Sequence, residues 1–152
     1  MCQDLDVNER TAADARELAL LVKATQAALN QRMDEVLRPL GLTVAQYACL
    51  SNLHAEPGIS SSELARRTFV SRQSMNVLLQ GLEKQGMVER AHEPGPRRER
   101  AALPTPLAQD ALGRAESAVA PVLDRMLSSL DAAQRGALRT ALTACRDALL
   151  DT

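Results

Sequence analysis

The sequence predicts a mainly α-helical fold that contains one small β-hairpin. Apolar residues, chiefly Leu, Val, Ala and Met, recur at steps of three and four over most of the chain, as they do along one face of a helix. Thr, Ser or Asp stands three positions before Gln or Glu at several points, which is the signal of a capped helix start. Near the middle, two short β-prone runs flank the stretch EPGPRRER, whose prolines and glycine are typical of a turn.

Long helices are expected at both ends of the chain. Residues 11–38 carry apolar side chains at helical spacing, with Thr11 as the expected cap and Pro39 as the stop. Thr105 is expected to cap a second long helix, which has proline at its first position, and Asp131 to cap the last one. The apolar faces of these helices exceed what one small lobe can cover, so they predict a partner chain.

Three shorter helices and the hairpin are expected between the long ones. Thr43 with Gln46, and Ser60 with Glu63, have the spacing of two reciprocal capping boxes. Ser71 is expected to cap the third helix, and a glycine closes it. The runs MVERA and RAALP are expected to pair as strands. A short helix, a tight turn, a second helix and a small hairpin form the order of a winged helix-turn-helix lobe.

The helix that starts after Ser71 is the candidate DNA-recognition helix. Arg72, Gln73 and Asn76 are expected on the face opposite its apolar stripe, and such side chains form paired hydrogen bonds with guanine or adenine edges. Phosphate contacts are assigned to small donors near helix N-termini, namely Ser62, Ser71 and Ser74. The alternative is a merely solvated polar face, but the capped helix before it and the basic hairpin after it favour DNA contact.

Charge is unevenly distributed along the chain. The formal net charge is -1, from 18 basic and 19 acidic side chains. Residues 60–104 hold eight Lys or Arg and five Asp or Glu, a net of +3, so the remaining residues carry -4. A basic segment within a nearly neutral protein is consistent with a local DNA-binding surface.

Residues 40–112 contain a set of linked motifs, namely LT-x-x-Q, SSSELA, VSRQS, LE-x-x-G-x-VER and an arginine pair before TP. Taken together, they resemble the MarR family of bacterial transcription regulators. The resemblance implies one domain over residues 1–152, with dimerisation helices at 11–40 and 106–150 and a winged helix-turn-helix lobe at 42–104. It also implies an obligate homodimer that binds a pseudo-palindromic double-stranded DNA operator, with recognition helices in successive major grooves ~34–36 Å apart.

By the same resemblance, the tip of the hairpin is a wing that inserts an arginine into the minor groove. That arginine is Arg97 or Arg98, and the sequence leaves open which of them it is. A narrow A·T-rich minor groove has enhanced negative potential, which attracts a guanidinium. The acid that usually precedes this pair is replaced by Pro96. Pro104 stands where the family usually has Leu, and its missing N–H predicts weaker pairing of the return strand.

The resemblance further implies a small anionic aromatic effector that binds between the dimerisation helices and the lobe. Met33, Tyr47, His54 and Leu112 are the candidate walls of its pocket, with plain core packing as the alternative. The effector would act by binding one relative placement of the two lobes better than the other, which changes operator affinity.

Enzymatic, metal-dependent and membrane functions find no support in the sequence. His54 and His92 are the only histidines, and there is no Ser/His/Asp grouping, Gly-rich phosphate loop or H-E-x-x-H helix. We therefore expect no catalytic residue, no cofactor and no metal. No run approaches ~18 apolar residues and the first ten residues are acidic and polar, so we expect a cytoplasmic protein without a membrane span or signal peptide.

The expected function is that of a ligand-responsive DNA-binding regulator, more often a repressor than an activator. Two alternatives remain open. Cys49 could make the protein a redox-sensing regulator, although a helical cysteine is most often a small buried apolar residue. No Lys or Arg is close to Cys49 in the sequence to lower its pKa. The winged helix could also serve as a protein-interaction module without DNA binding.

Overall fold

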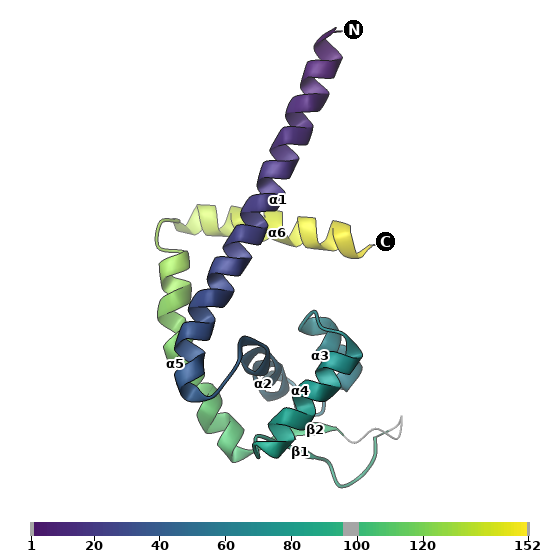
Figure 1. Cartoon of the computed structure of the whole chain (residues 1–152), viewed down its shortest axis with the longest axis vertical. Coiled ribbons are helices and arrows are strands. Elements are labelled where there is room, and N and C mark those ends of the chain that lie inside the picture. Colours follow the sequence, from purple (N-terminus) through teal and green to yellow (C-terminus); the bar gives the residue numbers. More distant parts are fainter. Residues whose placement is uncertain (1, 96–100, 152) are drawn as a thin grey trace. The chain divides into compact units, whose positions relative to one another are not determined.

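The computed structural model describes residues 2–95 and 101–151, with side chains from residue 11 onward, and it is mainly helical (Figure 1). The helices are α1 (Cys2–Leu37), the short 3₁₀ helix η1 (Arg38–Leu40), α2 (Val44–Ala55), α3 (Ser61–Arg67), α4 (Arg72–Lys84), α5 (Pro106–Met126) and α6 (Ala132–Leu150). Two strands, β1 (Val88–Arg90) and β2 (Ala102–Pro104), form one antiparallel sheet. The predicted fold class, mainly helical with a small β-wing, is confirmed.

The chain divides into two compact units, Met1–Val119 and Ala120–Thr152. In the first unit, α2, α3 and α4 gather into one lobe (Figure 1), with β1 against α4 and β2 against α2. The second unit contains the end of α5 and all of α6. Every buried apolar side chain among the described residues belongs to the first unit.

One apolar core holds the first unit together. Its members are Leu37, Leu42, Cys49, Leu50, Leu53, Ile59, Leu64, Ala65, Met75, Leu79, Leu82, Val88, Ala102, Ala108, Ala111, Leu112, Ala115 and Val119. They are almost all aliphatic, as expected for a chain with one Tyr and one Phe. Tyr47 is half-buried and packs against this core, whereas Phe69 is exposed. The lobe is therefore positioned by Leu, Ala, Val and Met contacts.

Several predicted helix starts are confirmed at the level of hydrogen bonds. Thr43 accepts a hydrogen bond from the backbone N–H of Gln46, and the Gln46 side chain accepts one from the backbone N–H of Thr43. Asp131 and Gln134 form the same reciprocal box at α6. These bonds satisfy backbone N–H groups that have no partner within their own helix.

Two predictions about helix starts are wrong. The first helix begins at Cys2, so Thr11 lies inside α1 and does not cap it. The segment CQDLDVNER contains neither proline nor glycine, and therefore nothing in it ends a helix. At α3, Ser60 accepts the backbone N–H of Glu63, but the Glu63 carboxylate binds arginines and leaves the predicted box incomplete.

The hairpin pairs in spite of Pro104, so the expected weakening of its return strand is not seen. Pro104 lies opposite Val88 in the antiparallel register. The flanking backbone bonds run from Ala91 N–H to Ala101 O, 2.9 Å, and from Thr105 N–H to Met87 O, 3.0 Å. The alternation of an antiparallel ladder therefore makes Val88 and Pro104 a non-hydrogen-bonded pair, at which the missing N–H removes no bond.

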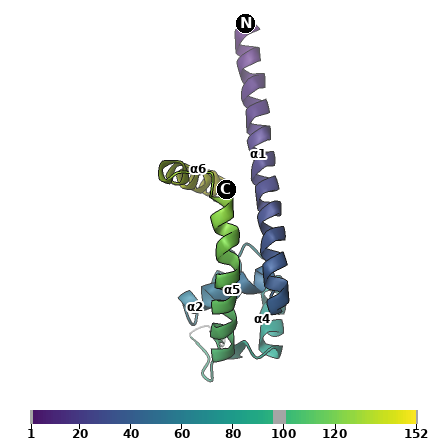
Figure 2. The ribbon, with the colours of Figure 1, turned by 90° about the vertical axis from the view of Figure 1, so that its left-hand side faces the viewer.

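The terminal helices carry apolar side chains that the described chain leaves exposed. On α1, Leu18, Leu21 and Val22 are all more than half exposed, and Figure 2 shows the N-terminal part of α1 running away from α2 and α4. On α6, no residue is buried, although Leu138 and Leu142 are one turn apart. Within the described residues, no helix is long and apolar enough to cross a membrane.

Candidate nucleic-acid interface

A tight turn with an unusual backbone connects α3 to α4. The N–H of Val70 donates to the carbonyl of Ala65 at 3.1 Å, and the N–H of Phe69 donates to that of Arg66 at 3.3 Å. This pair of bonds is the Schellman ending of a helix, in which one residue takes a left-handed conformation that favours glycine. Phe69 occupies that position, with φ 57°. The turn lets α4 begin only a few residues after α3 ends.

The first turn of α4 is capped and open to solvent. Ser71 accepts the backbone N–H of Ser74 at 3.1 Å, and its hydroxyl donates to the Ser74 hydroxyl at 2.9 Å. Both serines are exposed, whereas Ser62 in the first turn of α3 is half-buried. The three predicted phosphate contacts thus lie in the first turns of two neighbouring helices, where backbone N–H groups and the helix dipole favour an anion.

The three predicted base contacts lie on the outer side of α4. Arg72, Gln73 and Asn76 are exposed, while Met75 and Leu79 turn into the core. None of the three polar side chains forms a hydrogen bond or ion pair with another described residue, so their donors and acceptors remain available for a ligand.

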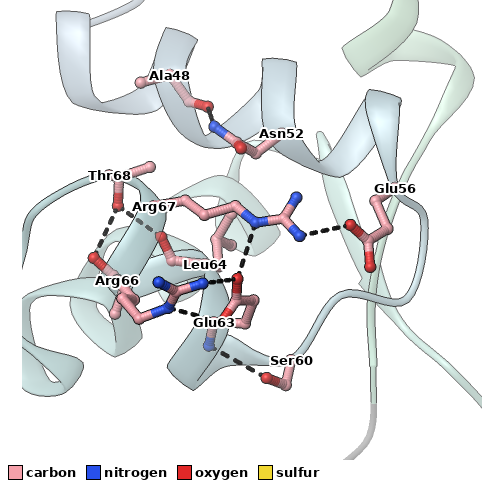
Figure 3. A network of polar contacts seen from close by, with 10 residues as sticks. Ala48, Asn52, Glu56, Ser60, Glu63, Leu64, Arg66, Arg67 and Thr68 are labelled. Atoms are coloured by element: carbon pink, nitrogen blue, oxygen red, sulfur yellow. Dashed lines mark hydrogen bonds and ion pairs between the residues drawn. The ribbon is translucent and has the colours of Figure 1, made fainter. Parts of the chain in front are cut away.

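An arginine and glutamate network runs along α3 and links this helix to the end of α2 (Figure 3). Arg66 binds both carboxylate oxygens of Glu63, at 2.9 and 2.6 Å, and Arg67 Nε donates to the same group at 3.0 Å. Arg67 also reaches Glu56 at 2.7 Å, which ties α3 to the end of α2. Hydrogen bonds from Arg66 and Arg67 lower the pKa of Glu63 to about 2. These two arginines therefore contribute positive charge that is already paired within the lobe.

The base of the wing is attached to α4. Arg90 on β1 forms an ion pair with Glu83 on α4, and Thr105 donates to the carbonyl of Gly86 at 2.7 Å. These contacts hold the hairpin beside the C-terminal end of α4. Arg97 and Arg98, the predicted minor-groove contacts, lie outside the described residues.

An open cavity of about 590 Å³ lies along α5 in the first unit. Its walls are Leu40, Gln109, Asp110, Gly113, Arg114 and Ser117. None of the four predicted pocket residues is among them. Leu112 is buried in the core, Met33 and Tyr47 pack against the core, and His54 is exposed near the end of α2. The effector-pocket assignment therefore stays a prediction.

Cys49 has the environment of a packing residue. Its side chain is fully buried, and its Sγ lies 4.0 Å from Sδ of Met75. Burial raises the pKa of the Cys49 thiol to about 12, which keeps it protonated and unreactive at neutral pH. This environment disfavours the redox-sensing alternative. Among the described residues, no cluster of three metal-ligating side chains occurs either.

Comparison with known proteins identifies the family. The family model described as MarR family matches residues 40–99. The chain is 37% identical over 123 residues to the HTH-type transcriptional repressor Rv2887 of Mycobacterium tuberculosis. The aligned residues make up 81% of this chain and 88% of that protein. The chain belongs to the MarR family. MarR-family regulators are non-enzymatic DNA-binding proteins, so the predicted transcription-regulator class and the absence of enzymatic activity follow from membership.

Solved MarR-family structures share the fold. The Rv2887 structures in complex with DNA and with salicylic acid superpose with TM-scores of 0.66 and 0.67 at 34% identity. Both cover 84% of this chain, and the matched parts are 96% and 95% of those chains. The transcriptional regulator PA3341 gives a TM-score of 0.80 at 26% identity, covering 89% of this chain and 99% of that one.

Sequence reasoning missed two exposed apolar residues near the candidate interface of this MarR-family chain. Phe69 in the turn and Val77 on α4 are 74% and 64% exposed. Their residue type conceals them, because apolar residues are normally assigned to a core. For Val77 a signal was available, since it lies four positions after Gln73 and so shares the outer face of α4.

Proposed function

We propose that this protein is a homodimeric, ligand-responsive transcriptional repressor that binds a pseudo-palindromic DNA operator. The observation that carries the proposal is the outer face of α4, where Arg72, Gln73 and Asn76 are exposed and have no partner among the described residues. A helix with this face, braced by α3 and followed by a wing, is suited to the major groove. The DNA complex of the 34% identical Rv2887 protein supports the same use of the fold.

In this proposal the predicted site residues divide by role. Arg72, Gln73 and Asn76 contact base edges in the major groove. Ser62, Ser71 and Ser74 anchor phosphates, because they lie at the N-terminal ends of α3 and α4. Arg97 or Arg98 enters the minor groove from the wing.

Dimerisation is proposed to use residues 11–40 and 106–150, which precede and follow in the sequence the lobe formed by residues 42–104. The exposed leucines and valine of α1, and an α6 without any buried residue, support this division. Two lobes related by a two-fold axis would read two half-sites in successive major grooves ~34–36 Å apart.

The proposed effector is a small anionic aromatic compound. Support comes from the structures of Rv2887 with salicylic acid and with p-aminosalicylic acid. Met33, Tyr47, His54 and Leu112 remain the proposed pocket walls. Binding would release the operator by favouring a different placement of the two lobes.

Selection of DNA duplexes from a random library by the purified full chain tests the proposal. We expect a two-fold symmetric motif, and a gel shift whose affinity falls steeply with salt because bound arginines release counterions. Replacing Gln73 with Ala should relax base preference at one position in each half-site, a loss of about 1–3 kcal/mol. No enriched motif and no shift at low salt would refute DNA binding and favour the protein-interaction module.

A further inference from the structure

One apolar side chain interrupts the outer face of α4. The exposed residues of this helix are Arg72, Gln73, Ser74, Asn76, Val77, Gln80 and Lys84, and Val77 is the only apolar one among them. Its side chain is 64% exposed, whereas Met75, Leu79 and Leu82 are completely buried. Val77 therefore takes no part in the core that shapes the helix.

Val77 lies at the centre of the outer face. A helix turns about 100° per residue, so Val77 is two residues, or about 200°, from both Met75 and Leu79. It thus points away from the core side. Gln73 lies four positions earlier on the same face, one helical turn toward the N-terminus.

The fold gains little from a valine at this position. An exposed side chain removes little apolar surface from water on folding. Valine also has lower helix propensity than alanine or glutamine, because its branched Cβ restricts the side chain. An apolar group in the middle of a polar binding face is explained by an apolar contact on the ligand.

This inference rests on the proposed function, in which α4 enters the major groove of DNA. The edges of the bases in that groove present hydrogen-bond donors and acceptors, and one apolar group, the 5-methyl group of thymine. We propose that Val77 packs against a thymine 5-methyl group of the operator. The contact would require thymine within a base step or two of the base that Gln73 reads, and would make Val77 a specificity-determining residue.

Replacement of thymine by uracil in the DNA isolates this contact, because it removes the methyl group and leaves base pairing intact. The probe is the duplex that the wild-type protein selects from a random library, with its thymines replaced by deoxyuridine one symmetric pair at a time. We expect one pair at which wild-type affinity falls, by about fourfold for each methyl group removed. Val77→Ala should show a smaller loss at that pair, because its shorter side chain makes less contact with the methyl group.

Two controls separate the contact from general effects on the helix. Gln80→Ala changes a neighbouring exposed residue of α4, and it should keep the wild-type response to uracil at every pair. Circular dichroism should show that Val77→Ala folds, because an exposed side chain is being truncated. Comparing each variant with itself on the two DNAs removes any difference in overall affinity.

The outcomes distinguish this inference from the function on which it rests. If the wild-type protein selects an operator but is indifferent to uracil at all positions, Val77 does not read a methyl group and DNA binding still stands. A loss of the same size in Val77→Ala as in the wild type also overturns the inference. If no duplex is selected at all, the proposed function fails together with the inference.

Discussion

Phe69 and Cys49 are two residues of this lobe whose environments differ from those that their residue types suggest. Phe69 closes α3 in a left-handed conformation at φ 57°, which is costly for any residue with a Cβ. Its ring is 74% exposed and so regains little through packing. Cys49, by contrast, is fully buried, and burial keeps its thiol protonated and unreactive. Neither environment is visible in the residue type, since Phe usually lies in a core and Cys often serves chemistry.

Replacing Phe69 with Gly should stabilise the protein. Glycine adopts φ near +57° without a Cβ clash, and we expect a gain of about 1 kcal/mol, or a rise in Tm of about 2–4 °C for a chain of this size. Thermal unfolding followed by circular dichroism measures the change. Phe69→Ala is the matched control, because it removes the same ring but keeps the Cβ. Equal gains in the two variants would show that backbone strain is not the cause.

At the scale of elements, short-range signals predicted the lobe well. Thr43, Ser71 and Asp131 cap their helices because cap and partner are only three residues apart. Predictions failed where another partner competed or no local signal existed. The Glu63 carboxylate does not complete the predicted capping box, because it binds two arginines that lie three and four residues further on. The exposure of Val77 was missed because of its apolar type, although its position four residues after Gln73 places it on the outer face of α4.

The Glu63 network should make α3 sensitive to acid. Because the arginines lower the pKa of Glu63 from 4.5 to about 2, its charged form stabilises the folded state above pH 4.5. That contribution is lost as pH falls from about 4.5 through about 2. Urea unfolding should therefore find Glu63→Gln less stable than the wild type at pH 6, with the difference vanishing near pH 2.

The control for this series is Glu89→Gln on β1, since Glu89 is exposed and forms no ion pair with a described residue. Its urea midpoint should follow that of the wild type at all pH values. A difference between Glu63→Gln and the wild type that persists at pH 2 would contradict the assignment to the carboxylate charge.

The wing arginines should contribute to affinity through counterion release and groove insertion. Arg97→Ala or Arg98→Ala should weaken operator binding, and the salt slope of the dimer should fall by about 2, since each chain loses one cationic contact. The larger loss identifies the arginine that enters the minor groove. Fluorescence anisotropy across a salt titration provides the measurement. Arg114→Ala, which removes a charge paired with Asp110 on α5, is the control and should leave the slope unchanged.

At the scale of the whole molecule, the chain has more apolar surface than it covers. The core of the first unit is complete, yet α1 and α6 both expose leucines at helical spacing. The sequence pattern predicted these faces correctly, because periodicity reports which residues share a side of a helix. The periodicity does not identify what covers these faces, because an apolar stripe has the same spacing whether it packs against its own chain or against another chain. An exposed apolar surface of this kind is typical of an interface between subunits.

The proposed dimer can be tested on α6 without touching the lobe. Leu138 and Leu142 lie one turn apart, and replacing both with Glu would place two charges in an apolar interface. Light scattering after size exclusion should then show a fall in mass from twice 16.4 kDa to 16.4 kDa. Operator affinity should fall with it, because each monomer binds one half-site alone. Thr140→Glu on the opposite side of α6 should remain dimeric, and a double-Glu variant that also remains dimeric would exclude this face from the interface.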